Sequence, residues 1–409
     1  MITDVIIIGG GAAGLCSAVY LKKKCPNLTV RILESSTRVG KKLALTGNGR
    51  CNITNMNIDV SRYHGEDVEF CRFALHKYDR FFTEGFFESI GVPFIFEGEK
   101  GYPASLQAAS VVDCLRFAAE ELGVITHLET KVTNILISNG KYKVVADNLS
   151  FLANNVIVAS GLFSGGDRLG CDGSMLMFLK KSGFKTVKTS PAIVQVKTEA
   201  DIVKQLKGIK FEGIATLKCD GRAVRSEGGE ILFCDYGLSG PPVLQISRGV
   251  SILDGNLSIS LDIMPQTTFA ELCDVLKNRR TTLKFRKLDE FFTGMLNKRL
   301  GQVVLKSVGL KLSDDVKNID DVSIKKIASL LKGFEIKVTG TTGYSNSQVT
   351  AGGLATKGFN SNTMESYDSR GLYAIGEVLD IDGDCGGFNL QWAWSSAFCA
   401  ADAIVEGLK

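Results

Sequence analysis

The sequence has few of the residues that build metal and redox centres. Its 409 residues include only three histidines, His64, His76 and His127, which are widely separated along the chain. None of the 11 cysteines forms a CxxC pair, which argues against a zinc site, an iron–sulfur cluster and a dithiol redox centre. We therefore expect no metal site, and we interpret most cysteines as small buried apolar residues.

Long apolar runs are absent as well. No stretch approaches the ~20 apolar residues of a membrane-spanning helix, and the first apolar run, residues 5–8, is too short for the core of a signal peptide. We therefore expect a cytoplasmic protein with no membrane partner. With 44% hydrophobic residues, a chain of this length can bury the cores of two or three domains.

An excess of charge of one sign is confined to one region. The net charge is only +4, but residues 265–333 hold 14 Lys and Arg against 8 Asp and Glu. Six cations fall within residues 277–287 without an acid between them: Lys277, Arg279, Arg280, Lys284, Arg286 and Lys287. We interpret this cluster as a solvated helix face and loop rather than a phosphate or nucleic-acid footprint, because the net imbalance is small. A nucleic-acid partner is therefore not expected.

The N-terminus reads as a buried strand, a glycine turn and a helix. The apolar run at residues 5–8 is followed by Gly9, Gly11 and Gly14 in the pattern GxGxxG. The first glycine allows a tight turn, the second lets the backbone approach a pyrophosphate, and the third lets the helix pack closely on the strand. Glu34, twenty residues beyond Gly14, can accept hydrogen bonds from a ribose diol and would repel a ribose phosphate. This site therefore favours FAD or NAD over NADP, with a purely structural turn as the alternative.

The C-terminal region favours FAD over NAD. Gly376 and Glu377 end an apolar strand at residues 372–375, where FAD proteins present a carboxylate and backbone amides to the ribityl chain and pyrophosphate. The glycines of residues 383–387 lead into a helix over residues 390–406. Its N-terminus can face the flavin pyrimidine and stabilise anionic reduced flavin by ~0.3 to 2 kcal/mol.

The pattern changes along the chain predict an α/β fold, in which a Rossmann-like FAD-binding domain carries an inserted β-barrel-like domain that itself carries a helical insertion. Helices are expected over residues 268–278, 288–308 and 323–331 of that insertion. The predicted segments are 1–190, the first part of the FAD-binding domain; 191–264, the first part of a β-rich substrate domain; 265–333, the helical insertion; 334–350, the return of the β-rich domain; and 351–409, the second part of the FAD-binding domain.

Several unusual strings are similar to those of a known family. They are GGGAAG at residues 9–14, KKL at 41–43, TGNGRCN at 46–52, LSGP at 238–241, GEVLD at 376–380 and GGFNLQWAW at 386–394. Over essentially the whole chain they closely resemble the BaiN/YhiN-like flavoproteins. The resemblance implies a FAD-dependent oxidoreductase, often one that uses NAD(P)H, and one branch of the family is associated with reducing unsaturated 3-oxo bile-acid intermediates.

The motifs and the resemblance together define the expected FAD contacts. Ser160 and Gly161 stand where the family has Ala-Thr-Gly, and the loop at residues 162–173 lacks the family's usual proline, so it can shape a different substrate pocket. No second GxGxxG follows a strand, so NAD(P)H would be a transient co-substrate in the flavin cleft, with residues 277–287 as one landing place. The expected FAD-binding residues are Gly9, Gly11, Ala12, Ala13, Gly14, Glu34, Ser35, Lys42, Leu43, Thr46, Gly49, Arg50, Cys51, Asn52, Val132, Ser160, Gly161, Gly376, Glu377, Gly387, Asn389 and Leu390.

The expected chemistry is hydride transfer through flavin N5 to the β carbon of an unsaturated carbonyl compound, such as a steroid or bile acid, with protonation of the α carbon. Arg50 is the candidate for electrostatic stabilisation. Tyr102 and Tyr236 are candidate proton donors, although packing is favoured for both, and Cys51 is interpreted as a buried thiol. The alternatives are a flavin oxidase or monooxygenase, and a non-catalytic flavin-binding redox or nucleic-acid-associated protein. No feature predicts an oligomeric state.

Overall fold

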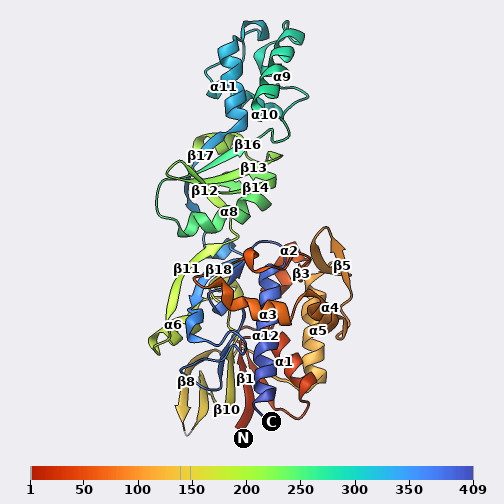
Figure 1. Ribbon diagram of the computed structural model, residues 1–409, viewed down its shortest axis with the longest axis vertical. Helices are drawn as coiled ribbons and strands as arrows, with labels where there is room; N and C mark the ends of the chain where they lie inside the picture. The colour runs from red at the N-terminus through yellow and green to blue at the C-terminus, as the bar shows by residue number, and fades with distance from the viewer. Residues whose placement is uncertain (1, 139, 148, 409) are drawn as a thin grey trace. The chain divides into compact units, whose positions relative to one another are not determined.

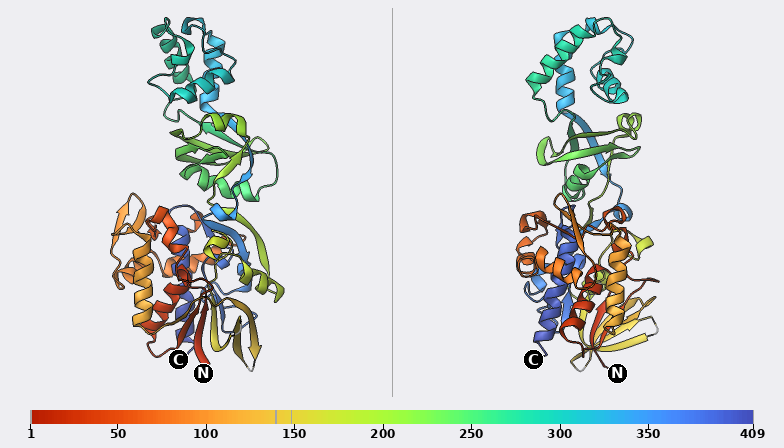
Figure 2. Two further views of the ribbon diagram at one scale, coloured as in Figure 1. Left: turned by 180° about the vertical axis from the view of Figure 1, so that it is seen from behind. Right: turned by 90° about the vertical axis from the view of Figure 1, so that its right-hand side faces the viewer.

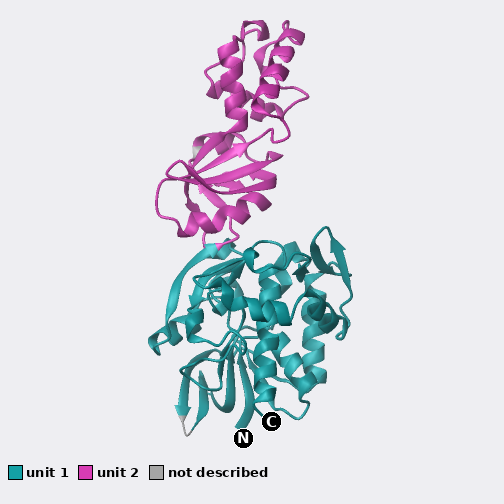
Figure 3. Cartoon of the chain, in the orientation of Figure 1, with its two compact units in different colours: residues 1–191, 344–409 teal, residues 192–343 magenta. Residues whose placement is uncertain are grey.

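A computed structural model describes residues 2–138, 140–147 and 149–408. The chain divides into two compact units, residues 1–191 with 344–409 and residues 192–343 (Figure 3). The first holds a Rossmann-type sheet and the second a closed barrel, which confirms the predicted fold class. The division into five segments remains a prediction, and residues 344–350 lie in the first unit.

The sheet of the first unit is built around β1 (Ile2–Ile8), whose residues 5–7 are completely buried. A run that is apolar at every position suits a strand covered on both faces. β1 pairs in parallel with β2 and β10, β2 with β7, and β10 with β19, while β9 and β8 extend the sheet in antiparallel fashion. The bounds are β2 (Val30–Leu33), β7 (Ile125–His127), β8 (Val132–Ser138), β9 (Lys141–Ala146), β10 (Leu149–Val158) and β19 (Leu372–Ala374).

Helix α1 (Ala12–Lys24) packs between α5 (Ala108–Glu121) and α12 (Phe388–Glu406), as Figures 1 and 2 show. α12 is buried at every position from residue 391 to 401, as expected of a helix whose residues are mostly apolar or small on all sides. None of the described helices is long and apolar enough to cross a membrane.

Short elements complete the first unit. They are α2 (Thr46–Gly49), β3 (Thr54–Asn55), β4 (Tyr63–His64), α3 (Arg72–Lys77), α4 (Arg80–Glu88), β5 (Phe94–Glu97), β6 (Lys100–Pro103), α6 (Ser174–Lys181), β11 (Thr186–Ala192), β18 (Val349–Leu354) and β20 (Asp382–Gly383).

The second unit contains a barrel whose six strands all pair in antiparallel fashion. Alternate residues of its strands, such as Ala215 and Leu217, are completely buried inside it, the pattern of a strand with one face inward. The strands are β12 (Val196–Thr198), β13 (Lys210–Cys219), β14 (Arg222–Phe233), β15 (Gly237–Ser239), β16 (Leu257–Asp262) and β17 (Phe334–Thr341), with helices α7 (Ala200–Gln205) and α8 (Pro241–Ile252).

The helical insertion lies between β16 and β17 and consists of α9 (Phe269–Thr282), α10 (Lys298–Ser307) and α11 (Asp321–Lys332). The single helix expected over residues 288–308 is wrong. Residues 288–290 form one 3₁₀ turn, Gly294 adopts φ +82°, and α10 begins only after Asn297, whose side chain accepts the N–H of Arg299. Asparagine is a preferred N-cap because its side chain replaces the missing helical acceptor, so the apolar periodicity spans two helical segments.

Candidate functional site

The three glycines of the N-terminal turn have different surroundings. A Cβ added to Gly9, which has φ +105°, would lie 2.6 Å from the carbonyl oxygen of Ala159. One added to Gly14 would lie only 2.0 Å from the carbonyl oxygen of Gly9, so α1 packs directly on the end of β1. A Cβ on Gly11 would meet no atom of the described residues within 4 Å. Gly11 therefore leaves open space at the N-terminus of α1, where the backbone amides have no side-chain cap.

Glu34 ties the end of β2 to the glycine turn. One carboxylate oxygen accepts the N–H of Gly10 at 2.8 Å, and the other accepts the N–H of Ser36 at 2.7 Å. The side chain of Ser35 is exposed beside it. Since each carboxylate oxygen can accept two hydrogen bonds, Glu34 retains capacity for a ribose hydroxyl.

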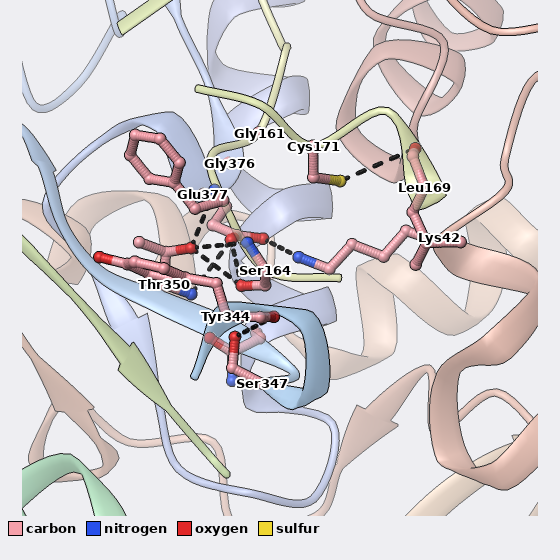
Figure 4. Close-up of polar contacts among 12 residues, drawn as sticks. Lys42, Gly161, Ser164, Leu169, Cys171, Tyr344, Ser347, Thr350, Gly376 and Glu377 are labelled. Atoms are coloured by element: carbon pink, nitrogen blue, oxygen red, sulfur yellow. Dashed lines mark hydrogen bonds and ion pairs between the residues drawn. The ribbon is translucent and has the colours of Figure 1, made fainter. Parts of the chain in front are cut away.

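Glu377 joins four separate segments (Figure 4). Its carboxylate pairs with Lys42 Nζ and accepts hydrogen bonds from Ser164 Oγ at 2.9 Å and from the N–H of Thr350 at 3.1 Å. Ser164 Oγ also lies 2.9 Å from Thr350 Oγ1. The sequence motifs identified Lys42 and Glu377 but not Ser164 or Thr350, which orient the Glu377 carboxylate.

The strands β1, β10 and β19 end beside one another, and so do the motifs that follow them. A Cβ on Gly9 would lie 2.9 Å from Ser160 Cα, and one on Gly376 would lie 3.1 Å from Ala13 Cβ. The N–H of Gly376 donates to Ser396 Oγ of α12 at 3.0 Å. The structure therefore gathers the glycine turn, Ser160 with Gly161, and Gly376 with Glu377 at the carboxyl edge of the parallel strands, which is where this fold binds ligands.

The TGNGRCN string folds into a turn dominated by positive φ values. They are +57° at Gly47, +55° at Asn48, +82° at Gly49 and +59° at Cys51. Glycine and asparagine tolerate this region, which explains most of the string. Cys51 is completely buried, and burial raises the pKa of its thiol to about 12, so the thiol is protonated at neutral pH.

Asn52 carries an unsatisfied acceptor at the N-terminus of α12. Its Oδ1 is buried and has no hydrogen-bond partner in the part of the chain that the structure describes. Gly387 caps α12 with φ +100°, and a Cβ added there would lie 2.8 Å from that Oδ1. Asn389 fixes the preceding loop, because its side chain accepts the N–H of Gly383 and donates to the carbonyl oxygen of Gly383, both at 2.8 Å. The backbone amides at the start of α12 and the unpaired Oδ1 of Asn52 therefore lie beside one another.

This arrangement fits FAD. The pyrimidine edge of a flavin carries acceptors at N1 and O2 and a donor at N3, which complement the free amides of α12 and the Oδ1 of Asn52. The open space at Gly11 and the N-terminus of α1 suit a pyrophosphate. Buried unsatisfied groups are rare in proteins, so the orphaned Asn52 oxygen is itself an indication of a ligand.

Further predicted contacts have the following local positions. Leu43 is buried in a 3₁₀ turn, Leu43–Leu45, and its carbonyl oxygen accepts a hydrogen bond from Thr46 Oγ1 at 2.7 Å. Val132 begins β8 and pairs with Ala146. Ala12 and Leu390 are half-buried at the starts of their helices.

Two of the three candidate catalytic residues lie together. The Arg50 guanidinium stacks 4.4 Å from the ring centroid of Tyr102 and pairs with Glu97, which raises the Arg50 pKa. Burial raises the pKa of Tyr102, so its phenol is a donor at neutral pH. Tyr236 belongs to the other unit, and burial raises the pKa of its phenol as well.

Both tryptophans position this site from within the core. Trp392 and Trp394 are almost completely buried. Trp392 Nε1 donates to the carbonyl oxygen of Gly376 at 3.1 Å, and Trp394 Nε1 donates to that of Ile53 at 3.0 Å. They therefore link α12 to the two backbone segments that contain Glu377 and Asn52.

The fold and the comparisons define an FAD-dependent oxidoreductase. The chain belongs to the HI0933-like family, whose model, described as the HI0933-like protein Rossmann domain, matches residues 3–403. Over 98% of both chains it is 32% identical to the 3-dehydro-bile acid delta(4,6)-reductase of Clostridium scindens. It is also 30% identical to the ribosomal RNA dihydrouridine synthase of Haemophilus influenzae, again over 98% of both chains. These findings confirm the resemblance to the BaiN/YhiN-like flavoproteins.

Among solved structures, the fold is shared with a flavocytochrome c3 fumarate reductase in its open conformation. The TM-score is 0.50 at 15% identity, and the match covers 99% of this chain and 78% of that chain. A quinol–fumarate reductase matches with a TM-score of 0.51 at 15% identity, over 98% of this chain and 70% of that chain.

Proposed function

We propose that this chain saturates a carbon–carbon double bond conjugated to a carbonyl group. The names of two full-length relatives describe variants of this one change. Double bonds at positions 4 and 6 are conjugated to a 3-oxo group, and dihydrouridine is uridine whose ring double bond, conjugated to a carbonyl, has been reduced. Because the two relatives are similarly distant, the shared reaction is better supported than either substrate.

The observation that carries this proposal is the unpaired Asn52 Oδ1 beside the free amides of α12. When bound, FAD supplies a hydride from N5. With FAD bound, the amides of α12 would stabilise negative charge on the flavin by ~0.3 to 2 kcal/mol, and Asn52 would hold the cofactor by accepting a hydrogen bond. We assign Arg50 to stabilise charge on the substrate carbonyl oxygen. We assign the Tyr102 phenol to donate the proton to the α carbon.

We further propose that NADH or NADPH reduces the flavin by docking transiently beside it, at the position that the substrate later occupies. The sequence of the second unit contains no GxGxxG turn that would hold a nicotinamide cofactor separately. The nicotinamide and the substrate would then bind beside the flavin one after the other.

Anaerobic stopped-flow absorbance of the FAD-loaded protein tests both proposals. Mixing with NADH or NADPH should bleach the flavin, and a conjugated 3-oxo steroid or a uridine-containing RNA should restore its absorbance. Bleaching that only oxygen reverses would indicate the oxidase alternative. Failure of both nicotinamides to bleach the flavin would contradict the proposed donor.

Uridine in ribosomal RNA is a second candidate substrate. It is favoured by two relatives with that activity in their names, of which the one from Escherichia coli is 28% identical over 98% of both chains. The test is mass spectrometry of nucleosides from ribosomal RNA incubated with the reduced protein. Uridine that gains the mass of two hydrogen atoms would support this candidate, and unchanged uridine would contradict it.

A further inference from the structure

Helix α9 (Figure 1) is followed by a turn, and one aromatic side chain in that turn is exposed. Phe285 is 89% exposed, while Tyr367, the next most exposed of the large apolar residues described, is 67% exposed. Lys284 Nζ lies 5.0 Å from the centroid of the Phe285 ring, and Arg286 follows on the other side. We call residues 284–286 the KFR turn.

The two cations of the KFR turn differ from their neighbours. Of the six cations in residues 277–287, three form ion pairs: Lys277 with Asp274, Arg280 with Asp321, and Lys287 with Asp315. A fourth, Arg279, donates to the carbonyl oxygens of Phe291 and Thr293. Lys284 and Arg286 form no ion pair with any residue that the structure describes, so their charges are available to a partner.

The KFR turn is held by backbone hydrogen bonds on both sides. The N–H of Arg286 donates to the carbonyl oxygen of Leu283 at 2.8 Å, and the carbonyl oxygen of Arg286 accepts the N–H of Val316 at 3.0 Å. Next to it, Lys287 and Asp315 form a β-bridge. The exposed ring is therefore presented on an ordered backbone, which lowers the entropic cost of binding.

We propose that the KFR turn binds single-stranded RNA. Aromatic rings stack on unpaired bases, and lysine and arginine neutralise the adjacent phosphates. The inference rests on the proposed function, since it identifies RNA as the carrier of the conjugated double bond to be reduced. A membrane surface fits less well, because insertion requires several neighbouring apolar side chains, whereas Phe285 has a cation on each side.

Fluorescence anisotropy of a short fluorescein-labelled oligouridine with the FAD-loaded full chain tests this proposal. Phe285→Ala should weaken binding at least about fivefold, the lower end of the effect of losing one base stack. The double variant Lys284→Ala/Arg286→Ala should reduce the slope of log K against log salt by ~1.4, since each phosphate contact in a single strand contributes ~0.7.

Matched controls come from the same unit. Val322 is an apolar residue that is 60% exposed, and Lys325 and Lys326 are exposed cations on α11. Val322→Ala and the double variant Lys325→Ala/Lys326→Ala should change RNA affinity less than the KFR variants do. Equal losses in controls and KFR variants would overturn the inference. Binding to anionic phosphatidylglycerol vesicles that depends on Phe285, without RNA binding, would overturn it too.

Flavin reduction and enone turnover by the same wild-type preparation separate this inference from the proposed function. If NADH bleaches the flavin and an enone restores it, but RNA binding is insensitive to the KFR variants, the inference fails and the proposed function stands. If RNA binding depends on the KFR turn but no acceptor reoxidises the flavin, the proposed function fails and the RNA site stands.

Discussion

Replacing Gly11 or Gly14 with alanine should separate cofactor binding from folding. Gly11 has φ −82° and ψ −162°, which alanine adopts readily, and an added Cβ would meet no atom within 4 Å in the part of the chain that the structure describes. We therefore expect Gly11→Ala to change the free energy of unfolding of the apoprotein by less than about 0.5 kcal/mol. At Gly14 the Cβ would lie 2.0 Å from the carbonyl oxygen of Gly9. Since that contact involves backbone, Gly14→Ala should destabilise the protein by about 3 kcal/mol, the upper end of typical overpacking costs.

The order of effects on FAD affinity should be reversed. The Gly11→Ala methyl would occupy the space proposed for the pyrophosphate and displace it from the amides of α1. Hydrogen bonds to charged groups contribute ~1.5 to 3 kcal/mol each, so losing one or two should weaken FAD binding about 100-fold. Gly14→Ala should lower FAD affinity less under conditions in which the variant is still folded.

Urea unfolding of the apoprotein and quenching of FAD fluorescence measure the two quantities. Gly85→Ala is a suitable control, because Gly85 lies in α4 and its added Cβ would also meet no atom within 4 Å. A Gly11→Ala variant that binds FAD as tightly as the wild type would refute the placement of the pyrophosphate. Wild-type stability of Gly14→Ala would refute the packing argument.

Three further predictions concern single side chains. Asn52→Ala should weaken FAD binding by about tenfold, equivalent to ~1.4 kcal/mol, without destabilising the apoprotein, because its Oδ1 has no partner among the described residues to lose. A loss of apoprotein stability would contradict this. Glu377→Gln should lower the free energy of unfolding by about 1 to 2 kcal/mol by breaking the partly buried pair with Lys42, whereas a urea midpoint equal to that of the wild type would exclude a stabilising pair. Burial raises the thiol pKa values of Cys51 and Cys71 from 9.0 to about 12. The contribution of these two thiols to the free energy of unfolding should therefore be complete below pH 9 and should decline above it, because the unfolded chain loses these protons first. Urea midpoints that do not fall between neutral pH and pH 10 would contradict this.

The sequence predicted the local geometry of several parts of the candidate site. The turn at Gly9, the acid at Glu34 and the helix ending the chain are each recognisable within a short string, because a turn or a buried strand restricts the residue types it can contain. The helical break before Asn297 was missed for a local reason, since apolar spacing on both sides of the break is compatible with one helix.

The contacts that were missed are all long-range. Ser164 and Thr350 are 186 residues apart in sequence, and both bond to Glu377 or to each other. Serine and threonine are common in loops for many reasons, so neither residue carries a signal of its own. The unsatisfied Asn52 oxygen could not be predicted either, because the lack of a hydrogen-bond donor near it depends on the positions of residues that are distant in sequence.

The residues of the proposed cofactor site and those of exposed turns differ in how freely they can be substituted. The proposed FAD contacts lie at the carboxyl ends of β1, β10 and β19 and at the start of α12, where closely packed glycines and the partly buried carboxylate of Glu377 leave little freedom for substitution. Two relatives are similarly distant from this chain and have different substrates in their names. A change of substrate through residues that hold no cofactor would disturb the cofactor site least. An exposed turn such as residues 284–286 can change without disturbing the core, because neither Lys284 nor Arg286 forms an ion pair among the described residues. Under the proposed function, exposed residues such as 284–286 are therefore a more economical place to change the substrate than the residues that would hold the cofactor.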